Sequence, residues 1–301
     1  MNNMIKKERI QLPNGEHIAY FMVGNGPKNL ILIHGNHTSS YQYLPLLKDI
    51  PDNYTTYAID LRGFGDSTYY RRIESIEDFA NDVVMFIKKL EIDKFNVIGW
   101  SLGGGVAMQL AAKLNNQVEK MILISSTTYK GYPLYKKDDD GNLAYGDAYT
   151  SPEDLLNDNI LVKPVVEMIK NNDLENMKTW LSKNFYEYSR ADEKTLELMA
   201  QESLKQRNLI DADFALASFN MGSMHNFYNA GNHDINNIKC SILHIIGQHD
   251  SMTPRYMSLE NYYKLEDQST LLEYERCGHS ILIDNPKVID EIFNFIERDS
   301  N

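Results

Sequence analysis

The 301-residue sequence predicts an α/β fold: a mostly parallel twisted sheet flanked by helices, with a helical segment inserted into it. Short apolar segments alternate with longer segments whose apolar residues recur at helical spacing, as buried parallel strands and their covering helices do. A second observation is a long stretch, residues 129–236, with helical patterns and no strand pattern. The third is a serine between two glycines directly after a predicted strand. We therefore expect a core of residues 1–128 and 237–301, and a helical cap formed by residues 129–236.

The N-terminal third contains the first strands of the expected sheet. Residues 8–23 predict a β-hairpin, because two strand-like segments flank a turn at 13–15. The short apolar segments 30–33 and 57–59 predict two further strands, each followed by a glycine-containing loop. Residues 76–90 predict an amphipathic helix, since their apolar residues recur every three or four positions.

The remaining elements continue this alternation. We predict strands at 95–98, 121–124, 242–246 and 271–274, helices at 102–114, near 254–264 and at 286–297, and a charged turn at 136–141. Cys240 and Cys277 stand at the start of one predicted strand and the end of another, beyond the distance that a disulfide spans. Unpaired thiols are typical of a reducing compartment, so we expect a cytoplasmic protein.

Composition and charge argue against several classes of protein. A chain with 43% hydrophobic and 24% charged residues is typical of globular proteins. Its formal net charge of -12 disfavours nucleic acid and anionic membrane surfaces as partners. The N-terminal residues lack the apolar core of a signal peptide, and no apolar run approaches the roughly 20 residues of a membrane span. The sequence has no phosphate-binding Gly-x-x-x-x-Gly-Lys-Ser/Thr loop, and we expect neither a cofactor nor a metal ion.

Ser101, the serine between glycines, is the strongest candidate for a catalytic group. A strand that passes into a helix within one or two residues forces Ser101 into a strained conformation, and Gly99 and Gly103 remove side chains that would clash there. The turn exposes the hydroxyl and leaves the helix N-terminus facing a developing oxyanion. This is the Gly-x-Ser-x-Gly nucleophile elbow in its strand–turn–helix context. The alternative is a glycine-rich turn without chemistry.

A catalytic serine needs a base near neutral pH, and that base needs an orienting carboxylate. Such groups come from loops at the carboxyl ends of parallel strands. Asp250 directly follows the strand predicted at 242–246, and His279 follows the strand predicted at 271–274. We therefore expect His279 to be the base and Asp250 the orienting acid. For Asp250, the alternative is an N-cap for a helix that begins near Pro254.

The glycine loop after the strand at 30–33 is expected to complete the site. The backbone N–H of Asn36, or of His37 one position on, can pair with that of Leu102 to stabilise an oxyanion. Trp100 and His37 adjoin these groups and are the expected substrate-binding residues. Packing is the alternative role for Trp100.

Five motifs carry a resemblance to a known family. They are His34-Gly35-Asn36, Asp60-Leu61-Arg62-Gly63-Phe64-Gly65-Asp66-Ser67, Gly99-Trp100-Ser101-Leu102-Gly103-Gly104, Gly247-Gln248-His249-Asp250 and Gly278-His279-Ser280. In this order they resemble the α/β-hydrolase superfamily, which implies a Ser–His–Asp triad and a helical cap. The elbow is similar to that of some carboxylesterases, including pimeloyl-ACP methyl ester esterases. The first loop is similar to that of haloalkane dehalogenases, but those use a carboxylate nucleophile, whereas an alkylated serine would be a stable ether.

The expected activity is that of a serine esterase without a cofactor. Its substrate would be a small to medium, largely uncharged carboxylic ester, thioester or lactone, hydrolysed through an acyl-enzyme. Aromatic and Met side chains of residues 129–236 would form an apolar pocket where they do not serve core packing. One alternative keeps the scaffold for C–C bond hydrolysis, lactone opening or cofactor-free peroxidation. Another is a hydrolase-like ligand sensor with little turnover.

Overall fold

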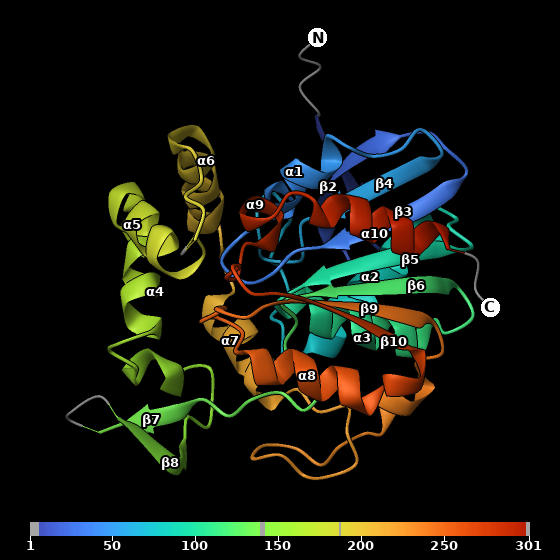
Figure 1. Ribbon diagram of the computed structural model, residues 1–301. Coiled ribbons are helices and arrows are strands. Elements are labelled where there is room, and N and C mark those ends of the chain that lie inside the picture. The colour runs from blue at the N-terminus through green and yellow to red at the C-terminus, as the bar shows by residue number, and fades with distance from the viewer. Residues whose placement is uncertain (1–5, 139–141, 187, 299–301) are drawn as a thin grey trace.

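The computed structural model describes residues 6–138, 142–186 and 188–298, and it has the α/β architecture that the sequence predicts (Figure 1). Its main sheet contains eight strands in the order β1-β2-β4-β3-β5-β6-β9-β10. These strands are β1 (Lys7–Gln11), β2 (His17–Gly24), β3 (Lys28–Ile33), β4 (Tyr54–Ile59), β5 (Phe95–Trp100), β6 (Val118–Ile124), β9 (Ser241–Gly247) and β10 (Ser269–Tyr274). Strand β2 is antiparallel to both of its neighbours, and all pairs from β4 to β10 are parallel.

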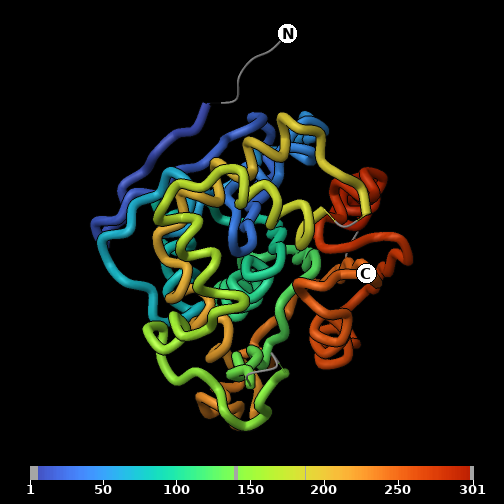
Figure 2. The backbone as a smooth tube through the Cα atoms, turned by 90° about the vertical axis from the view of Figure 1, so that its left-hand side faces the viewer, coloured from blue at the N-terminus to red at the C-terminus, as the bar shows by residue number. Residues whose placement is uncertain are grey.

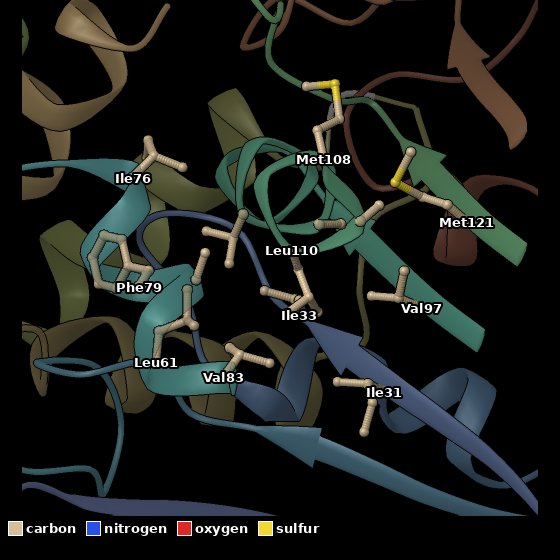
Figure 3. Close-up of a cluster of buried hydrophobic side chains, with 14 of the residues drawn as sticks. Ile31, Ile33, Leu61, Ile76, Phe79, Val83, Val97, Met108, Leu110 and Met121 are labelled. Atoms are coloured by element: carbon tan, nitrogen blue, oxygen red, sulfur yellow. The ribbon is translucent and has the colours of Figure 1, made fainter. Parts of the chain in front are cut away.

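Helices cover both faces of this sheet. The helices of the core are α1 (Leu44–Leu47), α2 (Ile76–Lys89), α3 (Leu102–Lys113), α8 (Arg255–Lys264), α9 (Ile281–Asp284) and α10 (Val288–Glu297). Strand β3 serves both layers: Leu30 and Leu32 pack with α1, α9 and α10, whereas Ile31 and Ile33 pack with α2 and α3. Figure 3 shows the cluster that contains Ile31 and Ile33, in which side chains of α2 and α3 pack against the sheet. Because the side chains on both faces of β3 are buried, its residues 30–33 are all apolar.

The core elements predicted from the sequence are confirmed, with small changes at their ends. Helix α2 begins at Ile76 because Ser75 and Asp78 form a capping box there. The C-terminal helix α10 begins at Val288 rather than at 286, and the short helices α1 and α9 were not predicted because four residues carry no periodic pattern. Both cysteines are unpaired, as predicted.

Within residues 129–236, the helices up to α6 (Glu193–Leu204) lie at the side of the molecule toward which the parallel strands point (Figure 1), and Figure 2 shows helices of this segment in front of the core from that side. The helices of this segment are α4 (Val162–Lys170), α5 (Leu174–Asn184), α6 (Glu193–Leu204) and α7 (Leu209–Ser218). The prediction that it contains no strand is wrong, since β7 (Tyr135–Lys137) and β8 (Leu143–Ala148) pair antiparallel. Strand β7 is half-buried throughout and β8 is mostly exposed, so neither has the alternating burial that marks a strand. The turn predicted at 136–141 falls partly on β7, and its residues 139–141 lie outside the described residues.

A buried ion pair ties α2 to the loop after β4. The Arg62 guanidinium donates to both carboxylate oxygens of Asp82, over 2.7 Å from Nε to Oδ2 and 2.5 Å from Nη2 to Oδ1. Asn14 donates a further hydrogen bond to Oδ1 at 2.8 Å. Both charged side chains are almost fully buried, so removing either one leaves the other charge poorly compensated and shielded from water.

We expect Asp82→Ala to lower the free energy of unfolding by about 3–5 kcal/mol, because it leaves the buried Arg62 with only the longer 3.9 Å contact to Glu16. Urea denaturation measures the change. The control on the same helix is Glu77→Ala, which removes a partly exposed pair with Lys113 and is expected to cost less than about 1 kcal/mol. Equal losses in the two variants would contradict the assignment of Arg62–Asp82 as the pair that stabilises this contact.

Candidate active site

Ser101 occupies a sharp turn between β5 and α3, with φ 55° and ψ -119°. The turn is possible only because glycines surround it. A Cβ at Gly103 would lie 2.1 Å from the carbonyl oxygen of Ile33, and one at Gly99 would lie 2.3 Å from the carbonyl oxygen of Gly103. A Cβ at Gly35 would lie 2.9 Å from the Cβ of Ser101. The serine is therefore held in the strained conformation predicted from the sequence, with part of its surface accessible.

Asp250 and His279 form a buried pair. The imidazole Nδ1 of His279 lies 3.0 Å and 2.9 Å from the two carboxylate oxygens of Asp250. Oδ1 of Asp250 also accepts the backbone N–H groups of Met252 at 3.0 Å and Thr253 at 2.8 Å. Helix α8 has Pro254 as its N-cap, so Asp250 shapes the loop before the helix and does not cap it. The carboxylate is thus fixed by the backbone and in turn fixes the imidazole.

Trp100 and Phe185 enclose the His279 ring. The Trp100 indole stacks on the imidazole at 5.2 Å between ring centroids, and its Nε1–H donates to the carbonyl oxygen of His279 at 3.1 Å. Phe185, from the 129–236 segment, meets the same ring edge-on at 5.0 Å. Because Trp100 directly precedes Ser101, these contacts bring the imidazole to the end of β5. With Nδ1 bound to Asp250, Nε2 is the ring nitrogen left for proton transfer.

The loop after β3 supplies a backbone N–H beside Ser101. The N–H of His37 donates to the side-chain Oε1 of Gln206 at 3.2 Å. By contrast, the N–H groups of Asn36 and Leu102 have no acceptor among the residues that the structure describes. This difference favours Asn36 over His37 as the partner of Leu102 in an oxyanion hole.

Side chains of the 129–236 segment hold this loop in place. Gln206 Nε2 donates to the Asn36 Oδ1 at 2.7 Å, and Ser203 Oγ donates to the His37 carbonyl oxygen at 2.5 Å. Asn36 Nδ2 donates to Asp213 Oδ1 at 2.6 Å. His37 itself has φ 56°, a conformation that is strained outside glycine, so these bonds stabilise an unfavourable backbone. Sequence reasoning missed Gln206, Ser203 and Asp213, although a carboxylate within an otherwise apolar helical stretch was a usable sign for Asp213.

Two histidines of the loop are held neutral. Burial, and then the nearby His279, lower the pKa of His37 to about 3, and its ring packs 4.7 Å from that of Trp180. Burial lowers the pKa of His34 to about 4. The His34 ring bridges the carbonyl oxygen of Gly35 at 2.7 Å and the backbone N–H of Leu61 at 3.0 Å, which is a structural role.

A cavity of about 360 Å³ lies between the core and the 129–236 segment. Trp100 and His37, the two predicted substrate-binding residues, both line it, and so does Ser280 beside His279. Much of the lining is apolar, from Leu44, Leu181, Phe185, Met199, Leu282 and Ile289. Ser101 does not line it, and the cavity approaches the serine only through Trp100, the residue before it in the chain. Its size and character suit one apolar group of a small molecule.

One group of carboxylates has the spacing of a cation site. Asp60, Asp66 and Glu202 each place an oxygen within 4.8 Å of the others. The Lys7 ammonium lies among them, at 2.7 Å from Asp60, 3.3 Å from Asp66 and 3.5 Å from Glu202. Burial alone would lower the pKa of Lys7, but these carboxylates raise it above its ordinary value. The lysine thus takes the place of a metal ion and ties Glu202 of α6 to the core.

Comparison with known proteins agrees with this architecture. A family model described as the alpha/beta hydrolase fold matches residues 28–286, so the chain belongs to that family. It is 32% identical over 111 residues to a soluble epoxide hydrolase of Corynebacterium sp. strain C12, covering 37% of this chain and 38% of that one. It is 29% identical over 119 residues to a pimeloyl-[acyl-carrier protein] methyl ester esterase of Pectobacterium carotovorum, covering 38% and 45%. The chain thus spans less than half the length of these curated relatives.

The overall fold is shared with solved hydrolase structures. The enol-lactonase from Burkholderia xenovorans LB400 superposes with a TM-score of 0.72 at 16% identity, covering 97% of this chain and 100% of that one. Identity at this level establishes the fold alone. Within the described residues, no helix is both long enough and apolar enough to cross a membrane.

We expect Gln206→Leu to lower kcat about 10- to 100-fold with little change in KM, because the Asn36–His37 loop loses two hydrogen bonds and its N–H moves from the oxyanion position. Steady-state hydrolysis of an ester measures both constants. Gln201→Leu is the control, since Gln201 is exposed on α6 and bonds only Glu197 of the same helix. An unchanged kcat in Gln206→Leu would show that the loop keeps its conformation without this contact.

Asp213 is expected to give a measurable pH dependence of stability. Burial raises the pKa of its carboxyl to about 7, the Asn36 amide opposes that rise and the Asp158 charge adds to it. A raised carboxyl pKa means that the folded state binds the proton more tightly, so stability falls as the pH rises from about 4 to about 7. Asp213→Asn removes this contribution. The free energy of unfolding of wild type minus that of the variant, measured by urea denaturation, should therefore fall from pH 5 to pH 8. A constant difference would contradict the raised pKa of Asp213.

Proposed function

We propose that this protein is a serine hydrolase that cleaves a small to medium, largely uncharged carboxylic ester, with thioesters and lactones as related substrates. One observation carries the proposal: Ser101 sits in a strained strand–turn–helix directly after Trp100, whose indole stacks on His279 of the buried Asp250–His279 pair. Such a turn is costly to maintain and exposes one hydroxyl, which is the arrangement that nucleophilic catalysis requires.

The mechanism assigns one task to each group. Ser101 Oγ attacks the substrate carbonyl carbon while His279 Nε2 accepts the hydroxyl proton. Asp250 holds the Nδ1–H tautomer and stabilises the imidazolium that forms. The N–H groups of Asn36 and Leu102 donate to the carbonyl oxygen as it becomes negative. His279 then protonates the leaving alkoxide, and afterwards activates the water that hydrolyses the acyl-enzyme.

The 129–236 segment would act as the cap of this site. Its Phe185 touches His279, and its Gln206 holds the oxyanion loop, so the segment contributes to the site directly. The cavity lined by Trp100 and His37 would accommodate one apolar group of the substrate. A volume of about 360 Å³ favours acyl or alkyl groups of moderate length over polymers.

The identity of the nucleophile argues against epoxide opening, despite the similarity to an epoxide hydrolase. Attack by Ser101 on an epoxide carbon would leave an ether, which water does not cleave under enzymatic conditions. Attack on an ester carbonyl leaves an acyl-serine instead, and this is hydrolysed by general base catalysis. Acyl transfer is therefore the reaction that the serine can complete.

We expect Ser101→Ala to lower kcat for short p-nitrophenyl esters by more than about 1,000-fold, because the covalent route is lost. Fluorophosphonate labelling of the protein should disappear in the same variant. Ser218→Ala is the control, since that hydroxyl bonds the carbonyl oxygens of its own helix. Retained turnover in Ser101→Ala would overturn the proposed nucleophile. Labelling of wild type without turnover of esters, thioesters or lactones would favour a ligand sensor.

A further inference from the structure

Asp213 of α7 is a carboxyl that the proposed reaction does not use, yet it lies next to the oxyanion loop. Its Oδ1 accepts the Asn36 amide at 2.6 Å. Asn36 follows Gly35, which stands so near Ser101 that a Cβ there would lie 2.9 Å from the serine Cβ. Asp213 thus contacts the residue that follows Gly35, the glycine that lies against Ser101.

The carboxyl lies deep in the protein but still has accessible surface. Burial raises its pKa to about 7, which requires protein on most sides. Its side chain nevertheless remains partly exposed, and the same holds for Ser101 and Tyr132. Burial, and then the charge of Asp213, raise the pKa of Tyr132, so these two side chains are electrostatic neighbours. Asp213 is therefore a deeply placed carboxyl that keeps some accessible surface next to the loop that carries Asn36.

No cation of the described residues neutralises this carboxyl. It has no ion-pair partner among them, and its Oδ2 has no hydrogen-bond donor there. The charged group that acts on it is another carboxylate, Asp158, whose own partner is Lys137. Asp211, two residues earlier on α7, shows the contrast, since Arg72 pairs with it at 2.6 Å. A partly accessible carboxylate without a compensating cation is costly, and a ligand that brings a positive charge would stabilise it.

We propose that Asp213 is a substrate-recognition residue that binds a protonated amine, so that the preferred ester carries one ammonium group a short distance from its reacting carbonyl. This rests on the proposed function and changes the substrate in one respect: the otherwise uncharged ester carries a single ammonium group. An ammonium group supplies the missing charge and the donor for Oδ2. The net charge of -12 also favours the approach of cationic molecules.

Matched pairs of esters test the proposal on either side of the scissile bond. For the acyl side we would compare p-nitrophenyl 4-(trimethylammonio)butanoate with p-nitrophenyl 5,5-dimethylhexanoate, because a primary amine in that position would cyclise on the activated ester. For the alcohol side we would compare 2-(trimethylammonio)ethyl acetate with 3,3-dimethylbutyl acetate. At pH 8 we expect wild type to favour the cationic member of at least one pair by about tenfold or more in kcat/KM. Asp213→Asn should reduce that ratio to near one, whereas Asp211→Asn on the same helix should keep it.

A binding measurement separates this proposal from the proposed reaction. Calorimetric titration of Ser101→Ala with butylammonium should detect binding that butan-1-ol does not give, and the double variant with Asp213→Asn should lose it. If no ester is hydrolysed but this binding difference is found, the proposed reaction fails and the ammonium site stands. A neutral preference in both ester pairs, a ratio kept by Asp213→Asn, or equal binding with and without the carboxyl would each overturn the ammonium site.

Discussion

The close approach of three backbone segments at Ser101 is the constraint on which the rest of the site depends. The start of α3 lies against the end of β3, where any side chain at Gly103 would overlap the Ile33 carbonyl oxygen. This contact brings the Leu102 N–H and the loop carrying Asn36 to the same point. A wider separation would move the proposed nucleophile and both halves of the proposed oxyanion hole together, so the glycines determine the geometry of the whole candidate site.

The core alone does not complete that centre. The strained His37 is held by Ser203 and Gln206 of the 129–236 segment, and Lys7 links Glu202 of the same segment to the core. Docking of this segment and the conformation of the oxyanion loop are therefore energetically coupled. Any motion that lifts α6 and α7 would relax the loop, so substrate entry and catalytic competence depend on the same hydrogen bonds.

The sequence predicts those parts of the structure that depend on residues close together in the chain. Strand β3 and helix α2 carry burial patterns of their own, and Asp250 and His279 follow strands that must end at one edge of the sheet. Gln206 and Asp213 could not be found in this way, because their contacts depend on how helices of the inserted segment dock on the loop after β3. The hairpin of β7 and β8 was missed for a related reason: neither strand has a buried face to leave a pattern.

The charge states of His37 and Asp213, the two titratable groups next to Asn36, would link substrate recognition to catalysis. His37 is neutral because it is buried, so it adds no positive charge that would oppose protonation of His279. Asp213 would have the opposite effect. A carboxylate hydrogen-bonded to the Asn36 side chain disfavours negative charge on a substrate carbonyl oxygen that the Asn36 N–H binds. During turnover that carboxyl must be protonated or paired. The ammonium group of a cationic substrate would pair with the Asp213 carboxylate while the oxyanion forms. The binding energy of this ion pair would then stabilise the transition state.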